Sequence, residues 1–197
     1  MRRGDEEFHR WYAPGGMGSG RGSTPEYTRH FRAYLEAFLL GCDVRSVLDY
    51  GCGDWQWASR VDWGDAEYLG VDIVPALVAS LQREHQRPRV RFEAVDPDTW
   101  AMPAVDLVIC KDVLQHLSNA EALALVRRFE ACARWVLYCN DLPLACRPIN
   151  DDTVRGGFRR VDMSKPPFSV RGRHVFHFST EPDGKAVFLW SRDASAR

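Results

Sequence analysis

Short, nearly continuous apolar runs alternate with amphipathic stretches along this chain, and the alternation constrains the fold more than any other feature. The apolar runs occupy residues 46–50, 68–71, 90–95, 105–110 and 135–139. Between them, helical spacing of apolar side chains predicts helices near residues 55–61, 76–86 and 119–131. Strands without a polar face are typical of a parallel sheet that is covered on both sides. The sequence therefore predicts βαβ units with right-handed crossovers.

The C-terminal region has a different pattern. Apolar segments at residues 175–179 and 186–190 flank Glu181-Pro182-Asp183-Gly184, a turn sequence that predicts an antiparallel hairpin. We therefore expect an α/β fold with a Rossmann-like, mostly parallel sheet and a C-terminal antiparallel hairpin. With 197 residues and no internal repeat, the chain is expected to form a single domain.

The chain begins with a charged segment and a glycine-rich run, together residues 1–23. The glycines make helix or strand costly in this run, because each loses much backbone entropy on ordering. A helix is expected directly afterwards. Ser23 is a suitable N-cap, Pro25 fits the first turn and Glu26 completes a capping box. The apolar spacing that follows predicts a helix that ends at Gly41.

Composition excludes several classes of partner. The 26 Lys and Arg residues nearly balance the 27 Asp and Glu residues, whereas nucleic-acid-binding chains usually have a basic surplus. The six cysteines form no CxxC pair and no His/Cys cluster at zinc spacing, so we expect reduced thiols and no metal. The sequence has no apolar leader and no run of ~20 apolar residues. We therefore expect a cytoplasmic protein that binds neither nucleic acid nor membrane.

The first predicted strand leads directly into a glycine turn within residues 47–55. Gly51 and Gly53 let the backbone approach a ligand closely, and ligands of open α/β sheets bind beyond the carboxyl ends of the strands. A dinucleotide fingerprint needs a third glycine where this chain has Gln56. Asp49, just before the turn, fits a cationic ligand better than a phosphate. A glycine turn without any ligand is the alternative.

The next two predicted strands also end in carboxylates. Asp72 lies about 20 residues beyond the glycine turn, where an acidic residue typically accepts hydrogen bonds from ribose hydroxyls. Asp96 follows the third strand. Each aspartate alone could be a solvated loop residue. Three acids at neighbouring strand ends, Asp49 included, predict a shared ligand that carries amino and hydroxyl groups.

With these motifs, the chain resembles the class I S-adenosylmethionine-dependent methyltransferases. Residues 47–55 are similar to the glycine-rich first motif of that family, residues 70–73 to its ribose-binding second motif, and residues 105–117 to its fourth-strand motif. The resemblance covers about residues 44–140. It implies the class I methyltransferase fold and S-adenosylmethionine as the methyl donor.

The resemblance also implies donor-binding roles for individual residues. Asp49 would lie near the methionine ammonium, the glycine turn near the methionine part, Asp72 at the ribose and Asp96 near the adenine. The residues expected to bind the donor are Asp49, Gly51, Cys52, Gly53, Asp72, Ile73, Asp96 and Lys111.

In that family, the sequence after the fourth strand indicates the acceptor. This chain has Cys110-Lys111-Asp112-Val113, which is neither the Asn/Asp-Pro-Pro-aromatic motif of amino-adenine DNA enzymes nor the Pro-Cys nucleophile of cytosine C5 enzymes. The resemblance therefore implies a small-molecule acceptor methylated on O, N or S, with Lys111, Asp112 and His116 as catalytic residues. His116 or Asp112 could accept a proton from the attacking group. Packing beneath the donor is the alternative role for His116, and a good amine needs no base.

The segment of residues 140–170 is longer and richer in proline and glycine than an ordinary α/β connection. This composition predicts a substrate lid or insertion. We hypothesise that Arg155, Arg159 or Arg160 binds an acidic group of the acceptor, while Phe158 or Phe168 covers its apolar part. Solvated arginines on a packed loop are the alternative.

Two other functions remain open. A nicotinamide-dependent oxidoreductase would have a similar fold, but Gln56 and the lack of a Tyr-x-x-x-Lys pair argue against it. A catalytically silent scaffold would use exposed tryptophans as a partner surface. The candidates for that surface are Trp11, Trp55, Trp57 and Trp63, of which Trp57 and Trp63 could equally be core residues.

Overall fold

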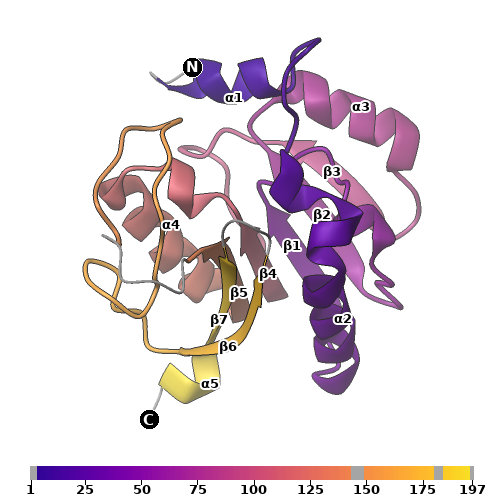
Figure 1. The fold of residues 1–197 in the computed structure, drawn as a ribbon. Helices are drawn as coiled ribbons and strands as arrows, with labels where there is room; N and C mark the ends of the chain where they lie inside the picture. Colours follow the sequence, from indigo (N-terminus) through magenta and orange to yellow (C-terminus); the bar gives the residue numbers. More distant parts are fainter. Residues whose placement is uncertain (1–3, 143–148, 180–183, 196–197) are drawn as a thin grey trace. The chain divides into compact units, whose positions relative to one another are not determined.

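The computed structural model describes residues 4–142, 149–179 and 184–195, and Figure 1 shows their fold. Contacts divide the chain into two units. The N-terminal unit is Glu6–Ala101, and the C-terminal unit is Met102–Arg197 together with Met1–Asp5. Among the described residues, no helix is both long and apolar enough to cross a membrane.

The N-terminal unit contains three parallel strands in the order β3-β2-β1. These strands are β1 (Ser46–Tyr50), β2 (Glu67–Asp72) and β3 (Val90–Ala94). Helix α2 (Pro25–Gly41) precedes β1, and α3 (Pro75–His85) connects β2 to β3 and packs on both strands (Figure 1). Helix α1 (Asp5–Trp11) also belongs to this unit, except for its first residue, Asp5. The unit has two 3-10 helices, η1 (Arg21–Ser23) and η2 (Ala58–Arg60).

The C-terminal unit has strands in the order β4-β5-β7-β6. They are β4 (Val105–Lys111), β5 (Ala133–Asp141), β6 (Arg173–Ser179) and β7 (Gly184–Ser191). β4 and β5 are parallel, whereas β7 pairs antiparallel with both β5 and β6. These pairings confirm the predicted mostly parallel sheet with a C-terminal antiparallel hairpin. The hairpin turn at residues 181–183 lies outside the described residues.

Among its described residues, the C-terminal unit has three helices after β4. η3 (Leu114–His116) follows β4, α4 (Asn119–Cys132) lies beside β4 and β5 in Figure 1, and α5 (Arg192–Ser195) follows β7. A capping box begins α4, since Ser118 accepts from the Glu121 N–H and Glu121 accepts from the Ser118 N–H. Residues 149–170, the described part of the predicted insertion beyond β5, contain no helix. The insertion begins later than predicted, because Asn140 and Asp141 belong to β5.

Two sequence-based predictions for the N-terminal unit are wrong. The helix expected at residues 55–61 is only the 3-10 helix η2, because Trp55 has a left-handed backbone (φ +59°) that an α-helix does not tolerate. The capping box expected at Ser23 and Glu26 does not form. Ser23 ends η1, and Thr24 is the N-cap of α2 without a side-chain cap bond. Helix α2 begins at Pro25, one residue later than a cap at Ser23 implies, and ends at the predicted Gly41.

An aromatic cluster fills the core of the N-terminal unit. The Trp55 ring contacts Tyr68 and Phe92 at centroid distances of 5.9 and 5.2 Å, and the Trp63 ring lies 4.5 Å from Tyr68. Trp57 is buried with them. The suggested partner surface is therefore wrong for Trp55, and the alternative of core residues is correct for Trp57 and Trp63.

Candidate functional site

The glycine turn of the N-terminal unit is fixed to the end of the neighbouring strand. Gly51 and Gly53 have φ values of +75° and +56°, a region in which glycine is the unstrained residue. The N–H groups of Gly51 and Cys52 donate to the Val71 carbonyl at 2.9 and 3.0 Å. The turn from β1 thus crosses the carboxyl end of β2, and the buried Cys52 lies between the two glycines.

Asp72, the last residue of β2, is bonded to the glycine turn itself. Its Oδ2 accepts from the Gly53 N–H and its Oδ1 accepts from the Val74 N–H, both at 3.1 Å. Burial raises the pKa of Asp72 despite these donors. Each carboxylate oxygen has two acceptor positions, so the side chain is oriented by the backbone and can still accept hydroxyl hydrogen bonds. Ile73, between Asp72 and Val74, is partly exposed.

Asp49 lies in the core beneath the turn. Its side chain is buried, and its Oδ2 accepts a 2.6 Å hydrogen bond from the Tyr68 hydroxyl. Burial raises the pKa of Tyr68, and the neighbouring Asp49 carboxylate raises it further. The tyrosine is therefore a permanent donor. The Asp49 residue is only 1% exposed, which favours an indirect contact with a ligand amine.

Asp96 lies two residues beyond β3 and is exposed. Its Oδ1 accepts from the Asp98 N–H at 2.9 Å and closes a turn. The Val95 N–H donates to the Asp72 carbonyl at 3.0 Å, which joins this turn to the end of β2. The three aspartates thus lie at or just beyond the carboxyl ends of neighbouring parallel strands, as the sequence predicts.

The N-terminal segment adds two residues that the sequence did not identify. The Ser19 N–H donates to Asp54 Oδ2, and Ser19 Oγ accepts from the Asp54 N–H, both at 3.1 Å. Tyr12 Oη lies 2.9 Å from Ser19 Oγ. A Cβ on Gly53 would overlap Ser19 Oγ and lie 2.8 Å from Tyr12 Oη. Residues 12–19 therefore cover the glycine turn, and the glycine-rich composition of this run was the only signal.

The C-terminal unit contains a cluster of four charges at the end of β4, in which Lys111 and Lys185 are buried and Asp112 and Asp141 are partly exposed. Lys111 Nζ lies 2.5 Å from Asp112 Oδ2, and Lys185 Nζ lies 2.5 Å from Asp112 Oδ1. Lys185 Nζ also contacts Asp141 Oδ1 at 2.9 Å. The sequence pointed to Lys111 and Asp112, but not to Lys185 or Asp141. The register of β5 and β7 brings these two together, because Asp141 pairs directly with Lys185.

These contacts decide the protonation state of Asp112. Burial alone would raise the pKa of this carboxyl, but the ammonium groups of Lys111 and Lys185 outweigh burial and lower the pKa to about 2. Asp112 is therefore a carboxylate at neutral pH, and both of its oxygens contact ammonium groups. This arrangement suits a structural anion better than a general base.

His116 ends η3 and is held by the insertion. Its Nδ1 lies 2.8 Å from the Gly157 carbonyl oxygen. A carbonyl oxygen only accepts, so Nδ1 carries the proton and the neutral ring has its lone pair on Nε2. Burial lowers the pKa of His116, although the Gly157 carbonyl and the Asp112 and Asp141 carboxylates oppose this effect. His116 is thus a neutral imidazole with a fixed tautomer.

Backbone hydrogen bonds attach the insertion to the turn that carries His116. The Gly156 N–H donates to the His116 carbonyl at 2.9 Å, and the Arg159 N–H donates to the Gln115 carbonyl at 3.0 Å. Phe158, between them, is 52% exposed, and its ring centroid lies 5.9 Å from that of His116. This segment therefore orients the imidazole and presents an exposed aromatic ring beside it.

The structure gives two of the three hypothesised arginine anchors other partners. Arg155 pairs with Asp5 at 2.6 Å and with Glu121 at 3.0 Å. Arg159 is buried, donates to Asn119 Oδ1 and lies over the Phe168 ring. These contacts favour structural roles for both arginines.

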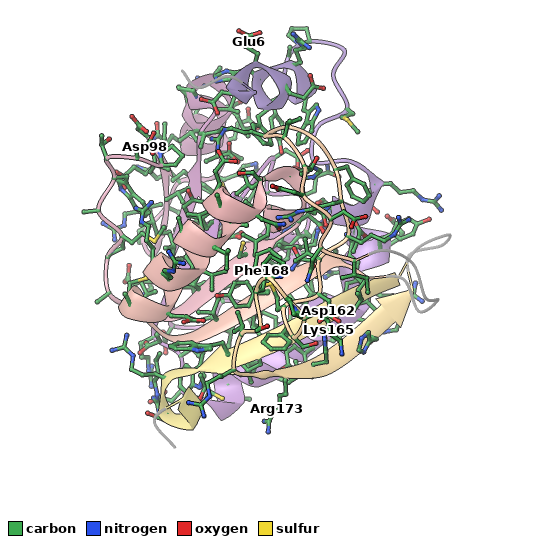
Figure 2. The ribbon with its side chains drawn as sticks, turned by 90° about the vertical axis from the view of Figure 1, so that its left-hand side faces the viewer. Glu6, Asp98, Asp162, Lys165, Phe168 and Arg173 are labelled. Carbon is green, nitrogen blue, oxygen red and sulfur yellow. The ribbon has the colours of Figure 1, made fainter. Side chains whose placement is uncertain are left out.

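Beyond Arg159, backbone hydrogen bonds join Asp162, Lys165 and Phe168 (labelled in Figure 2): the Lys165 N–H donates to the Asp162 carbonyl at 3.2 Å, and the Phe168 N–H donates to the Lys165 carbonyl at 3.1 Å. The Asp162 carboxylate accepts from Ser164 and contacts His174 Nε2 at 3.0 Å. Arg173, at the start of β6, points away from these residues (Figure 2).

Comparisons with known proteins agree with this geometry. The family profile described as a methyltransferase domain matches residues 47–134. No curated protein matches the chain significantly. The fold is similar to that of magnesium protoporphyrin IX methyltransferase from Synechocystis PCC 6803 with bound S-adenosylhomocysteine, with a TM-score of 0.67, 17% identity, and coverage of 96% of this chain and 94% of that chain.

A second similar structure is the N-methyltransferase NodS from Bradyrhizobium japonicum WM9 in complex with S-adenosylhomocysteine. Its TM-score is 0.65 at 14% identity, with coverage of 94% of this chain and 97% of that chain. The chain therefore has the class I methyltransferase fold, and the resemblance that the sequence motifs indicated is confirmed.

Proposed function

We propose that this chain, which has the class I methyltransferase fold, is an S-adenosylmethionine-dependent methyltransferase that acts on O, N or S of a small molecule. The observation that carries the proposal is the bond between the glycine turn and Asp72. It fixes a carboxylate beside a left-handed glycine turn at the strand end where the family binds the donor ribose. The methyltransferase profile over the same residues supports it.

The residues of the N-terminal unit fit this donor. Asp72 offers oriented acceptors for two ribose hydroxyls, and the partly exposed Ile73 adds an apolar contact. Asp96, at the next strand end, is exposed and suits the adenine amino group. Asp49 is assigned to the methionine ammonium through an intermediary, because its side chain is buried. When bound, the donor supplies an electrophilic methyl group on sulfonium.

We assign the acceptor chemistry to the turn after β4. His116, with its lone pair on Nε2, accepts the proton that an acceptor hydroxyl or amine loses when that atom is methylated. Asp112 and Lys111 do not move protons in this scheme, since their mutual contact keeps them as an ion pair. They support the turn that carries His116. The exposed Phe158 ring beside His116 suits an apolar part of the acceptor.

The structure favours this function over a nicotinamide-dependent oxidoreductase. A dinucleotide pyrophosphate binds at the N-terminus of the helix that follows the glycine turn. Here the turn is followed by η2, which has only three residues. A silent scaffold is also less favoured, because the tryptophans near the turn are core residues. We further place the protein in the cytoplasm and expect no nucleic-acid partner, given its net charge of −1.

A melting experiment tests the donor class. S-adenosylhomocysteine at about 100 times its dissociation constant should stabilise the protein by roughly 2.7 kcal/mol and raise the melting temperature by roughly 5–10 °C. NAD⁺ and NADP⁺ at the same concentration should have no effect. Stabilisation by a nicotinamide nucleotide but not by S-adenosylhomocysteine would overturn the proposal.

A further inference from the structure

Lys185 is a buried cation whose role the proposed chemistry leaves unassigned. It lies near the start of β7, its residue is 3% exposed, and its ammonium bridges two carboxylates from different elements. Asp112 follows β4, and Asp141 ends β5 directly opposite Lys185 in the sheet. A lysine is almost never this buried unless it is paired, and here its two partners compensate its charge.

The bridge holds an unfavourable backbone conformation. Asp112 has φ +59°, a left-handed value that is uncommon for a residue other than glycine. Its side chain is held from both sides by Lys111 and Lys185, and its N–H donates to the Cys139 carbonyl at 2.8 Å. These contacts fix the direction in which the chain leaves β4.

The same network reaches the turn that carries His116. The Asp141 N–H donates to Gln115 Oε1 at 3.1 Å, and Gln115 immediately precedes His116. The His116 N–H donates to the Val113 carbonyl at 3.0 Å, one residue after Asp112. The turn is thus fixed near its start by Asp112 and near its end by the Gln115 contact with Asp141. Lys185 is the residue that contacts both carboxylates.

We propose that Lys185 is a positioning residue for His116: its ammonium holds Asp112 and Asp141 together, fixes the turn, and shields the imidazole from the two carboxylates. The catalytic part of this proposal rests on the proposed role of His116 as a base. The electrostatic part concerns the folded protein alone and does not depend on methyl transfer.

The charges that face His116 come from three elements. Asp112 from the turn and Asp141 from β5 favour the imidazolium, whereas Lys185 from β7 opposes it. The Gly157 carbonyl of the insertion also favours the imidazolium, and burial disfavours it. With Lys111, Asp112, Asp141 and Lys185 all ionised, the cluster is neutral. Without Lys185 it carries one net negative charge, and a protonated His116 cannot act as a base.

Histidine NMR measures this effect without any acceptor. The imidazole resonances of isotopically labelled wild type, Lys185→Met and Lys185→Arg are followed from pH 5 to 8, and His116→Gln identifies the resonance. Lys185→Met should raise the pKa of His116, because it removes the cation that opposes the imidazolium and leaves both carboxylates. Lys185→Arg, which keeps the charge, should restore most of the wild-type titration. Lys165→Met, an exposed lysine of the same unit, is the control and should have no effect.

A second variant keeps the test decisive if Lys185→Met does not fold. Asp141→Asn removes one of the carboxylates that face His116 and should lower the pKa of His116. An unchanged titration of His116 in folded Lys185→Met, or in Asp141→Asn, would overturn the proposal. Because neither measurement uses donor or acceptor, this failure would be distinct from a failure to bind S-adenosylhomocysteine, which would refute the proposed function instead.

Discussion

The Gly53 N–H donates a 3.1 Å hydrogen bond to Asp72 Oδ2 and joins the turn after β1 to the last residue of β2. The two residues are 19 positions apart, and the parallel pairing of β1 with β2 brings them together. The hydrogen bond therefore fixes the turn and the carboxylate to each other. A change to either residue should affect ligand binding at the other.

Gly53→Ala should disturb the contact between the turn and Asp72 in two ways, by backbone strain and by a steric clash. A left-handed alanine costs about 1–2 kcal/mol, and its Cβ would also overlap Ser19 Oγ and displace the N-terminal segment. Gly64→Ala is a matched control, because Gly64 has φ +54° but no atom within 4 Å of an added Cβ. Calorimetry should show S-adenosylhomocysteine binding weakened roughly tenfold or more, which is 1.4 kcal/mol, only in Gly53→Ala. Equal affinities in the two variants would contradict this role of Gly53.

Asp112→Asn should destabilise the protein in a pH-dependent way. The pKa of Asp112 falls from its ordinary 3.8 to about 2 on folding, so the carboxylate stabilises the fold above pH 3.8. That contribution, roughly 2 kcal/mol, is lost as the pH falls through 2. Urea unfolding should show a lower free energy of unfolding for Asp112→Asn than for wild type at pH 7, and a smaller difference below pH 4. Asp151→Asn, at an exposed aspartate of the same unit, should show no such dependence. If the loss of unfolding free energy in Asp112→Asn did not depend on pH, packing and not charge would be its cause.

His116 should make the fold less stable in mild acid. Its pKa is lowered from 6.5 on folding, so the unfolded chain binds a proton first as the pH falls. Stability is therefore lost below about pH 6.5. His116→Gln should reduce the loss of unfolding free energy between pH 7 and pH 5.5, whereas His177→Gln, at an exposed histidine, should not. An identical pH dependence in wild type and His116→Gln would show that the imidazole is not kept neutral by the fold.

The insertion should behave as a fixed wall and not as a mobile lid. The amides of Gly156, Arg159 and Val161 donate to carbonyls of residues outside the insertion, and Val161 is buried. Hydrogen exchange in the protein without ligands should therefore be slow at these three amides and fast at the exposed Val154. Rapid exchange at all of them that slows only on ligand binding would indicate a lid.

Local pattern was sufficient to predict the strands and the acids that follow them. Near-continuous apolar runs placed β1 at its observed bounds and put Asp72 at a strand end. The failed helix at residues 55–61 has a local cause that composition does not reveal, namely the left-handed Trp55 and its burial in the aromatic cluster.

Long-range contacts explain the residues that the sequence did not identify. Lys185 meets Asp112 across 73 positions, and Ser19 meets Asp54 across 35. Neither pair has a motif, since only strand register or the path of a glycine-rich segment brings the residues together. The contacts with Lys111 and Lys185 also change the interpretation of Asp112. A carboxylate between two ammonium groups is a weaker base than the isolated acid that the sequence suggests.

The central claim is that Asp72 holds the donor, and calorimetric titration of S-adenosylhomocysteine into Asp72→Ala tests it most directly. Asp62→Ala is the matched control, because Asp62 accepts from the N–H two residues later, as Asp72 does, but lies at an exposed loop. Loss of charged hydrogen bonds worth about 1.5–3 kcal/mol should weaken binding roughly 10- to 150-fold in Asp72→Ala, with wild-type affinity in Asp62→Ala. Wild-type affinity in a folded Asp72→Ala variant would contradict the account.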